Sequence, residues 1–307
     1  MRIHASGICG TDAWMASGTL EFRPFPLLLG HEGVGEVVAV GDAVTTRKIG
    51  DRVGIPMVQQ TCGQCEACLK ERPNSFASAI NCTGGPRLTG VTVDGAFAEY
   101  IAADAEGTIV LPEGISYEDA APTMCAGYTV WAALRRAEPK PGATIGVVGI
   151  GGLGHLAIQY AKAAGYRVVA VTKSAGKYEV ARQFGAEEVV ADGAAVRAAG
   201  GADVLLHTSS SHASVVDAMN GLKPWGKVVV MGVATDELNL PAGPVAFQGF
   251  EVIGSAHNGN EYLVEALEIV AQGKVKPMIE VYPKERIGEA YEATRTGRTR
   301  FRSVVTF

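Results

Sequence analysis

The spacing of apolar residues divides the chain into two parts with different patterns. From about residue 141 onward, short apolar runs alternate with segments whose apolar residues share one helical face. The run 144–150 predicts a strand, 153–165 a helix that ends at Gly165, and 167–172 a second strand. Such strand–helix units predict an α/β fold with a parallel, doubly wound sheet. The alternation continues through helices at 177–186, 214–222 and 262–275 and strands at 187–191, 203–209, 226–233 and 301–307.

The first part of the chain, up to about residue 110, has a different pattern. Short β-rich pieces, such as 33–41 and 96–103, are separated by Gly, Pro and Asp. This pattern predicts a compact, β-rich, barrel-like domain with long connections. No internal repeat, low-complexity segment or obvious linker is present in the sequence.

A glycine-rich loop follows the first predicted strand of the α/β part. Gly149, Gly151 and Gly154 form a G-x-G-x-x-G pattern that encloses Gly152 and Leu153. Glycines at these positions permit a tight turn, close approach of a pyrophosphate and tight helix–strand packing. The start of the following helix offers N–H groups to phosphate. A glycine-rich turn without a ligand is the plainer interpretation, but the flanking strands and helix favour a dinucleotide site.

The end of the second predicted strand bears on the choice of dinucleotide. NAD sites usually carry an acidic residue there, which binds the ribose hydroxyls. This chain has Thr172, Lys173 and Ser174, followed by Lys177. Hydroxyls and cations are therefore available for a 2′-phosphate, and no carboxylate repels it. The sequence favours NADP(H) over NAD(H), although both lysines could equally be solvated surface residues.

Composition narrows the class of protein. The 307-residue chain is 47% apolar and has a net charge of −5 without a basic block, which argues against nucleic acid as a partner. No apolar run reaches the ~20 residues that a membrane span needs, and the N-terminus lacks the apolar core of a secretory signal. Six cysteines in such a chain indicate metal ligands or buried thiols and a cytoplasmic protein.

Three residues have the chemistry of a catalytic metal site. Cys9, His31 and Cys125 would supply two thiolates and one imidazole, a set that leaves the fourth position of a zinc ion open for substrate or water. The three residues are far apart in sequence, so their spacing alone does not select them. Each by itself equally suits a buried structural role.

Seven motifs in a recognisable order identify a family. They are ASGICGTD, GHEGVGEVVAVGDAV, CGQCEACL, VDGAFAEY, EDAAPTMCAGYTVWAAL, GIGGLGHLAIQYAKAAG and GKVKPMIEVYP. With them the chain resembles, over nearly its whole length, the zinc-dependent alcohol dehydrogenases of the medium-chain dehydrogenase/reductase superfamily. The resemblance implies a GroES-like catalytic domain over 1–125 and 256–307 and a Rossmann dinucleotide-binding domain over 126–255.

The resemblance also implies roles for individual residues. The cysteine–histidine set described above matches the catalytic zinc ligands. Glu32 matches a carboxylate near the metal that helps ligand exchange, Asp12 matches the acid that orients the ligand histidine, and Thr11 matches the hydroxyl that hydrogen-bonds the substrate oxygen. Positions that contact the cofactor are matched by Thr129, Arg302 and the backbone near Gly232, Val233 and Ser255.

The function implied is hydride transfer between a primary or secondary alcohol, or the corresponding aldehyde, and NADP(H) or NAD(H). Zinc acts as a Lewis acid that favours loss of the alcohol proton, which Thr11 passes outward. Members of the superfamily are commonly dimers or tetramers, so we expect a homo-oligomer. The alternative is a superfamily member that binds NADP(H) without catalysis, although such a protein has no physical need for the full set of zinc-site residues.

Two departures from the family pattern qualify this interpretation. In many relatives the proton relay ends on a histidine three residues after Thr11, where this chain has Trp14. The relay would then use cofactor hydroxyls and water. The chain also begins only a few residues before Cys9, whereas relatives carry a longer segment there. We expect an N-terminally shortened form, whether natural, engineered or produced by the gene model.

A third departure concerns a second cysteine group. Cys62, Cys65 and Cys68 recur at a spacing of three, as in the structural zinc lobe of many relatives. The fourth cysteine of that lobe would stand where this chain has Phe76. Cys82 could bend in as a replacement, or the lobe could be metal-free and held by packing of Phe76. The sequence favours the second alternative, an incomplete lobe.

Overall fold

The structure consists of two compact units. The computed structural model describes residues 1–19, 26–70, 74–232 and 236–307. The first unit comprises Met1–Tyr128 and His257–Phe307, and the second comprises Thr129–Ala256. Among the described helices, none combines the length and the apolar character needed to cross a membrane.

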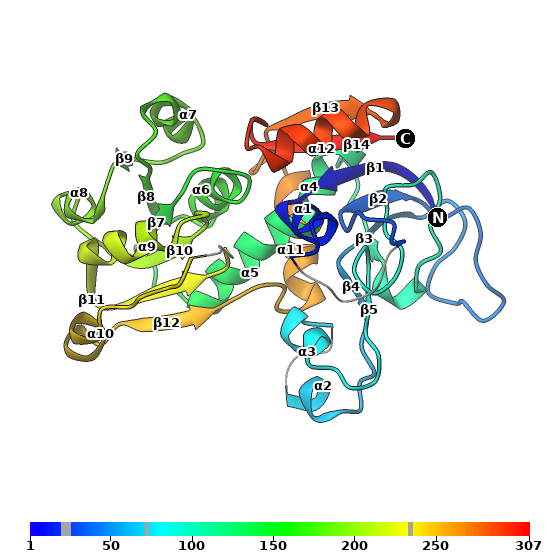
Figure 1. The fold of residues 1–307 in the computed structure, drawn as a ribbon, viewed down its shortest axis with the longest axis horizontal. Helices are drawn as coiled ribbons and strands as arrows, with labels where there is room; N and C mark the ends of the chain where they lie inside the picture. The colour runs from blue at the N-terminus through cyan, green and yellow to red at the C-terminus, as the bar shows by residue number, and fades with distance from the viewer. Residues whose placement is uncertain (20–25, 71–73, 233–235) are drawn as a thin grey trace. The chain divides into compact units, whose positions relative to one another are not determined.

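The second unit is built on a parallel sheet of six strands. Its spatial order, β12-β11-β10-β7-β8-β9, is the 6-5-4-1-2-3 arrangement of a doubly wound Rossmann sheet. The predicted parallel sheet is therefore confirmed. The strands, labelled in Figure 1, are β7 (Thr144–Val148), β8 (Arg167–Val171), β9 (Glu188–Val190), β10 (Ala202–His207), β11 (Leu222–Val230) and β12 (Glu251–Gly254).

Local sequence explains the central strand and helix of this unit. All five residues of β7 are buried, as expected of a parallel strand covered on both faces. Eight of the ten residues of α6 (Gly154–Ala163) are buried, and this helix packs against β7 and β8. Gly165 ends the helical stretch with φ +84°, a conformation that costs glycine little. The other helices are α5 (Tyr128–Ala137), α7 (Tyr178–Gln183), α8 (Gly193–Ala198), α9 (His212–Ala218) and α10 (Ala242–Gln248).

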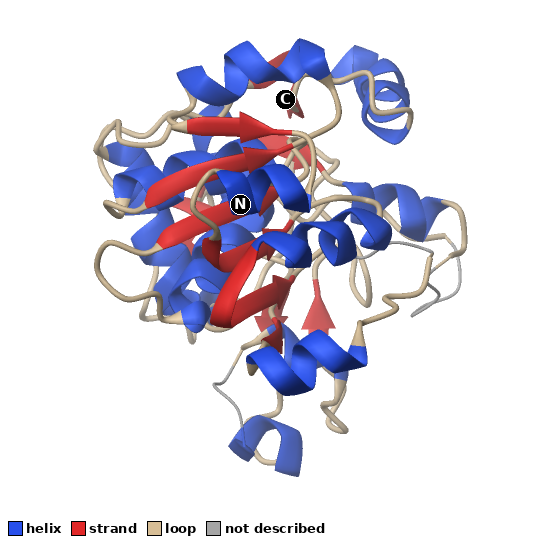
Figure 2. Ribbon diagram, turned by 90° about the vertical axis from the view of Figure 1, so that its left-hand side faces the viewer, coloured by secondary structure: helices blue, strands red, loops and turns tan. Residues whose placement is uncertain are grey.

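The first unit contains a mixed sheet that joins both ends of the chain. Its order is β13-β14-β1-β2-β3-β6, and β1 pairs with β14 and β2 in antiparallel fashion. The chain therefore begins and ends in neighbouring strands of one sheet (Figures 1 and 2). The strands are β1 (Arg2–Ile8), β2 (Gly33–Glu36), β3 (Arg52–Ile55), β6 (Ile109–Val110), β13 (Ile279–Pro283) and β14 (Arg302–Thr306).

Short helices and a two-stranded ribbon complete the first unit. The ribbon pairs β4 (Val58–Gln60) with β5 (Arg87–Leu88). A π-helical segment, Thr123–Gly127, follows α4 directly; such segments often occur at functional sites. The helices are α1 (Gly10–Ala16), α2 (Glu66–Lys70), α3 (Phe76–Ile80), α4 (Tyr117–Pro122), α11 (Asn260–Ala271) and α12 (Ile287–Arg295).

One predicted strand of the first unit is almost absent. The segment 96–103 forms only an isolated bridge, between Tyr100 and Arg2. Its backbone still exchanges hydrogen bonds with the start of the chain, since Ile101 N–H donates to the Met1 carbonyl and Ile3 N–H donates to the Glu99 carbonyl. The alternating pattern thus identified a paired segment, but too few consecutive bonds form to make a strand.

A buried histidine makes the second unit sensitive to acid. His207, at the end of β10, is fully buried, and neither of its ring nitrogens has a hydrogen-bond partner among the described residues. Burial lowers the pKa of His207 to about 4, against ~6.5 in an unfolded chain. Because the unfolded state then binds the proton more tightly, stability falls as the pH falls from 6.5 towards 4.

We expect the substitution His207→Leu to remove part of this acid sensitivity. Lowering the pH from 7.5 to 5 should cost the parent protein about 2 kcal/mol of unfolding free energy through His207, and the leucine variant should not lose this contribution. Urea unfolding of both proteins at the two pH values measures the difference. An equal loss in parent and variant would show that His207 does not titrate as described.

Candidate active site

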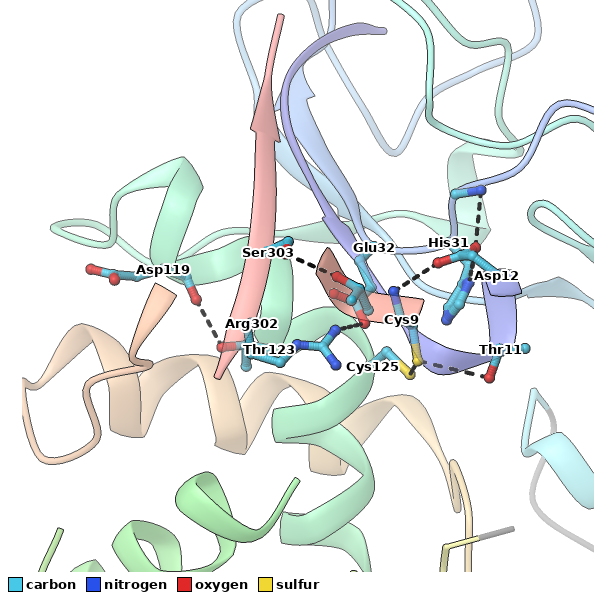
Figure 3. A network of polar contacts seen from close by, with 12 residues as sticks. Cys9, Thr11, Asp12, His31, Glu32, Asp119, Thr123, Cys125, Arg302 and Ser303 are labelled. Atoms are coloured by element: carbon cyan, nitrogen blue, oxygen red, sulfur yellow. Dashed lines mark hydrogen bonds and ion pairs between the residues drawn. The ribbon is translucent and has the colours of Figure 1, made fainter. Parts of the chain in front are cut away.

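A buried group of possible metal-ligand atoms lies where the inner strands β1 and β2 of the first unit's sheet end and begin. Cys9 follows β1, His31 and Glu32 directly precede β2, and Cys125 lies in the π-helical segment (Figure 3). The two sulfurs, one ring nitrogen and one carboxylate oxygen lie within 4.8 Å of one another. All four side chains are buried. The fold thus brings together the three residues predicted as zinc ligands and adds Glu32 to them.

Asp12 orients the histidine of this group. Its Oδ1 atom lies 3.0 Å from His31 Nδ1 and accepts a hydrogen bond from Gly30 N–H at 3.2 Å. Its Oδ2 atom accepts the Cys9 N–H at 2.8 Å. Burial alone would lower the pKa of His31, but the Asp12 carboxylate outweighs it and raises that pKa overall. Within the described part of the chain His31 Nε2 is buried without a hydrogen-bond partner, which leaves it available for a metal.

The two thiols of the group are coupled to each other. Cys9 Sγ and Cys125 Sγ are 3.9 Å apart. The hydrogen bond from Cys125, helped by His31, lowers the pKa of the Cys9 thiol, and the same pairing and burial raise the pKa of Cys125. Thr11 places its hydroxyl oxygen 3.7 Å from Cys9 Sγ, on the first turn of α1.

Glu32 is paired with a residue from the other end of the chain. The Arg302 guanidinium, at the start of β14, forms an ion pair with Glu32 Oε1. Burial raises the pKa of the Glu32 carboxyl to about 7, although Arg302 acts in the opposite direction. Glu32 Oε2 has no partner and lies where a side chain on Gly7 would collide with it. The sequence interpretation did not predict this pair; the cofactor contact assigned to Arg302 remains a prediction.

The glycine-rich loop lies in the second unit, between β7 and α6. Gly149 has φ +91°, and a Cβ atom there would stand 2.7 Å from the Ser209 backbone, so only glycine fits. A Cβ atom on Gly154 would meet the Gly149 carbonyl. At Gly151, by contrast, a Cβ atom would meet nothing within 4 Å, so this loop has open space for a ligand group. Gly152 and Leu153 complete the turn into α6.

The residues that favoured NADP(H) lie beside this loop. Lys173 and Ser174 follow β8 and are exposed. Thr172 Oγ1 accepts a hydrogen bond from Ser174 N–H at 3.2 Å. Lys177 was expected to offer its cation to a phosphate. In the structure its ammonium group instead donates a hydrogen bond to the Ile150 carbonyl at 2.7 Å. It therefore also supports the glycine-rich loop.

Three of the other positions assigned to the cofactor have defined places in the second unit. Thr129 is buried in α5. Gly232 N–H donates to the His207 carbonyl at 3.1 Å, and Ser255 N–H donates to the Val230 carbonyl at 2.9 Å. Both backbones therefore follow the carboxyl ends of sheet strands, where nucleotides bind in such folds. Val233 lies outside the described residues.

The second cysteine group contains four thiols. Cys65 and Cys68 sulfurs are 3.5 Å apart, those of Cys62 and Cys68 are 3.8 Å apart, and Cys82 Sγ accepts the Cys62 N–H at 3.4 Å. All four sulfurs lie within 4.8 Å of one another. The expectation of an incomplete lobe is corrected, because α3 (Phe76–Ile80) turns the chain back and brings Cys82 to the other three.

Backbone N–H groups favour the thiolate form in this lobe. The N–H groups of Cys68 and Thr83 lower the pKa of Cys65 to about 6, whereas burial raises the pKa of Cys68 to about 11. Four thiols with a closed, mutually close arrangement are the donor set of a structural zinc site. In Figure 1 the lobe lies around α2 and α3, away from the sheet of the first unit.

One buried residue near the active site escaped the sequence interpretation. His257 is 4% exposed, and its ring stacks on Tyr128, which directly follows the π-helical segment that contains Cys125. No local signal marks it, because it is an isolated histidine far in sequence from the residues it contacts.

Comparison with known proteins places both units in one family. Residues 1–113 match the alcohol dehydrogenase GroES-like domain, and residues 152–272 match the zinc-binding dehydrogenase domain. An alcohol dehydrogenase of Geobacillus stearothermophilus is 39% identical over 312 residues, which cover 99% of this chain and 90% of the relative.

Solved structures agree with this assignment. A cinnamyl alcohol dehydrogenase of Sorghum bicolor has a TM-score of 0.88 at 31% identity and covers 99% of this chain and 88% of its own. The alcohol dehydrogenase of Aeropyrum pernix has a TM-score of 0.88 at 29% identity, over 100% of this chain and 91% of its own. The predicted GroES-like and Rossmann-type fold is thereby confirmed, and the chain belongs to the zinc-type alcohol dehydrogenases of the medium-chain dehydrogenase/reductase superfamily.

Proposed function

We propose that the protein is a zinc-dependent dehydrogenase that interconverts a primary or secondary alcohol and its carbonyl product, with NADP(H) preferred over NAD(H). The observation that carries this proposal is the convergence of Cys9, His31 and Cys125 in one buried group. The same group would be costly to bury without a cation, because it contains ionisable thiols and a carboxylate.

The donor set fits a catalytic zinc ion. His31 Nε2 is a buried nitrogen without a protein partner, and two sulfurs lie close enough to share one metal. Two thiolates and an imidazole leave one position for substrate. A zinc ion held there would supply the Lewis acidity that eases deprotonation of an alcohol near neutral pH.

The neighbouring residues then have separate tasks. Asp12 keeps the His31 ring in place and its Nε2 atom directed to the metal position. The Thr11 hydroxyl, beside Cys9 Sγ, would hydrogen-bond the substrate oxygen and receive its proton. Trp14 has no ionisable group, so water or cofactor hydroxyls would take the proton onward. Glu32, with one free oxygen, is placed to assist exchange of the fourth ligand.

The nicotinamide cofactor would supply the hydride chemistry, while the chain supplies its binding site. Gly149 and Gly154 permit the close packing of the loop against the protein, and the open space at Gly151 would admit the pyrophosphate at the start of α6. The exposed Lys173 and Ser174 support a preference for the 2′-phosphate of NADP(H), and this preference in turn favours carbonyl reduction in the cell.

We further propose a homo-oligomer in the cytoplasm. All six cysteines are free thiols, which suits a reducing compartment. Self-association is supported by α10, none of whose residues is buried, and by the exposed side chains of Phe247 and Trp225. Large apolar side chains exposed together often mark a contact surface.

The catalytic zinc is tested with the substitution Cys9→Ser. We expect the parent protein to contain two zinc ions per chain and the variant to lose the catalytic one, because a serine hydroxyl is a poor replacement for a thiolate. Its kcat/KM for aldehyde reduction should fall about 10²- to 10⁴-fold, as expected for loss of several kcal/mol of transition-state stabilisation. Elemental mass spectrometry and NADPH oxidation provide the measurements. A variant with the parent's zinc content and activity would refute the proposed role.

The lobe is tested with Cys82→Ser. This change should lower the zinc content from two ions to one and lower the midpoint of thermal unfolding, because a closed four-thiolate site contributes to folding. Asn81→Ser, on the same turn, serves as the matched control and should retain both ions. If the parent itself contains a single ion, and Cys82→Ser leaves that ion in place, the lobe does not hold zinc.

Cofactor preference is tested with Lys173→Glu. The parent should have a higher kcat/KM with NADPH than with NADH. The added carboxylate should lower the value for NADPH about 2- to 5-fold, since one exposed charge contact is worth up to ~1 kcal/mol, and leave the value for NADH nearly unchanged. Lys140→Glu, before β7 and therefore at the opposite end of the sheet strands, is the control. Equal effects on both cofactors would argue against a 2′-phosphate contact.

A further inference from the structure

Side chains hold two successive carbonyl groups of the glycine-rich loop. The Ile150 carbonyl accepts a hydrogen bond from the Lys177 ammonium group at 2.7 Å. The Gly149 carbonyl accepts one from the Thr208 hydroxyl at 2.6 Å. This hydroxyl also lies 3.0 Å from the Val148 carbonyl, but that carbonyl already accepts the Thr208 N–H at 3.0 Å. The single hydroxyl proton of Thr208 is therefore directed to the shorter contact, at Gly149.

The next carbonyl of the loop is held in the same way. His155 Nδ1 lies 3.1 Å from the Gly151 carbonyl oxygen, which also accepts the His155 N–H at 3.1 Å. Because a carbonyl oxygen only accepts, Nδ1 carries the proton of this contact. The His155 side chain is fully buried, so bulk water does not compete for the bond. Three carbonyls in a row are thus fixed by donors from three segments, which lie after β10, before α7 and in α6.

A fixed carbonyl also fixes the N–H group of the next residue. The peptide unit is planar and almost always trans, so the C=O of one residue and the N–H of the next point in opposite directions. Because Lys177 holds the Ile150 carbonyl, the Gly151 N–H points away from Lys177. A Cβ atom on Gly151 would meet nothing within 4 Å, so a ligand group has room at this residue.

The held peptide groups suit an anion. Successive backbone N–H groups in a turn form an anion-binding concavity, and the first N–H groups of α6 add to it. The pyrophosphate of a dinucleotide carries a negative charge on each phosphate. The contact of Lys177 with Ile150 places its cation against the loop that follows β7, so its effect falls on the phosphates bound there.

We propose that Lys177 is a positioning residue for the pyrophosphate of the dinucleotide. Through the Ile150 carbonyl it aims the Gly151 N–H at the phosphates. Thr208 and His155 act in the same way on the adjacent peptide groups. The inference rests on the proposed dinucleotide site and extends it, because it assigns Lys177 to the group that NADP(H) and NAD(H) share rather than to the 2′-phosphate.

The test compares the parent with Lys177→Met in the binding of NADPH, NADH and ADP-ribose to the full-length protein. Methionine keeps an unbranched side chain of similar length and removes the ammonium group. We expect the Kd to rise about 3- to 10-fold, the size of one hydrogen bond, and by the same factor for all three ligands, since each contains the pyrophosphate. Lys177→Arg keeps a cationic donor and should restore most of the affinity. Isothermal titration calorimetry measures each Kd without any need for turnover.

Two other lysines provide matched controls. Lys173→Met removes the same charge from an exposed residue after β8; it should weaken the binding of NADPH and leave that of NADH and ADP-ribose nearly unchanged. The Lys223 ammonium group contacts Asp203 at 2.8 Å, at the opposite end of the sheet strands from the loop. Lys223→Met should therefore leave the Kd of all three ligands unchanged.

Thr208→Val tests the same mechanism without a change of charge. Valine has nearly the shape of threonine but no hydroxyl to donate to the Gly149 carbonyl. The Kd should again rise by one common factor for the three ligands, and Thr208→Ser, which keeps the hydroxyl, should restore most of the affinity. This pair of variants also decides the question if Lys177→Met does not fold.

Two results would overturn the inference and leave the proposed dinucleotide site intact. One is a Lys177→Met protein that binds all three ligands as tightly as the parent. The other is a loss confined to NADPH, which would assign Lys177 to the 2′-phosphate. Failure of the parent to bind either dinucleotide would instead refute the proposed site, and the inference with it.

Discussion

The carboxylate of Asp12 is the point on which the geometry of the active site depends. It accepts hydrogen bonds from the backbone of Cys9 and Gly30 and pairs with the ring of His31. These contacts join the end of β1, the first turn of α1 and the loop before β2. Because the group is buried, an unpaired donor would be costly. The carboxylate therefore fixes two predicted metal ligands relative to each other before any metal binds.

Charge balance imposes a second constraint on the same region. Thiols, a carboxylate and an imidazole are buried together, and burial of ions is costly unless they are paired. Arg302 supplies a permanent positive charge in contact with Glu32. A metal ion would supply the rest. The arginine and a metal ion would thus be complementary, because each neutralises negative charge that the other leaves unpaired in the group.

How far apart two contacting residues lie in the sequence explains which features could be predicted from the sequence. Gly149, Gly151 and Gly154 act within one turn, so their spacing, together with the strand and helix patterns on either side, indicated the loop. Cys9 and Cys125 are brought together only by the fold, and their selection needed a resemblance to known proteins. The place of Cys82 beside the other thiols depends on how α3 turns the chain back, and the burial of His257 depends on contacts with Phe76 and Tyr128, two distant segments. Neither arrangement has a local pattern, so the sequence favoured an incomplete lobe and missed the histidine.

The pairing of β1 with β14 has a consequence for how the molecule is made. The second unit is a continuous segment and can fold as soon as it has been synthesised. The sheet of the first unit cannot be completed at that stage, because Arg302 and β14 are synthesised after the whole second unit. Until then β1 has an unpaired edge, and Glu32 lacks its counter-charge. Assembly of the active site therefore follows synthesis of the second unit. A ribosome-bound chain that has not yet released β14 has all of its predicted metal ligands, but neither the strand that pairs with β1 nor the arginine that pairs with Glu32.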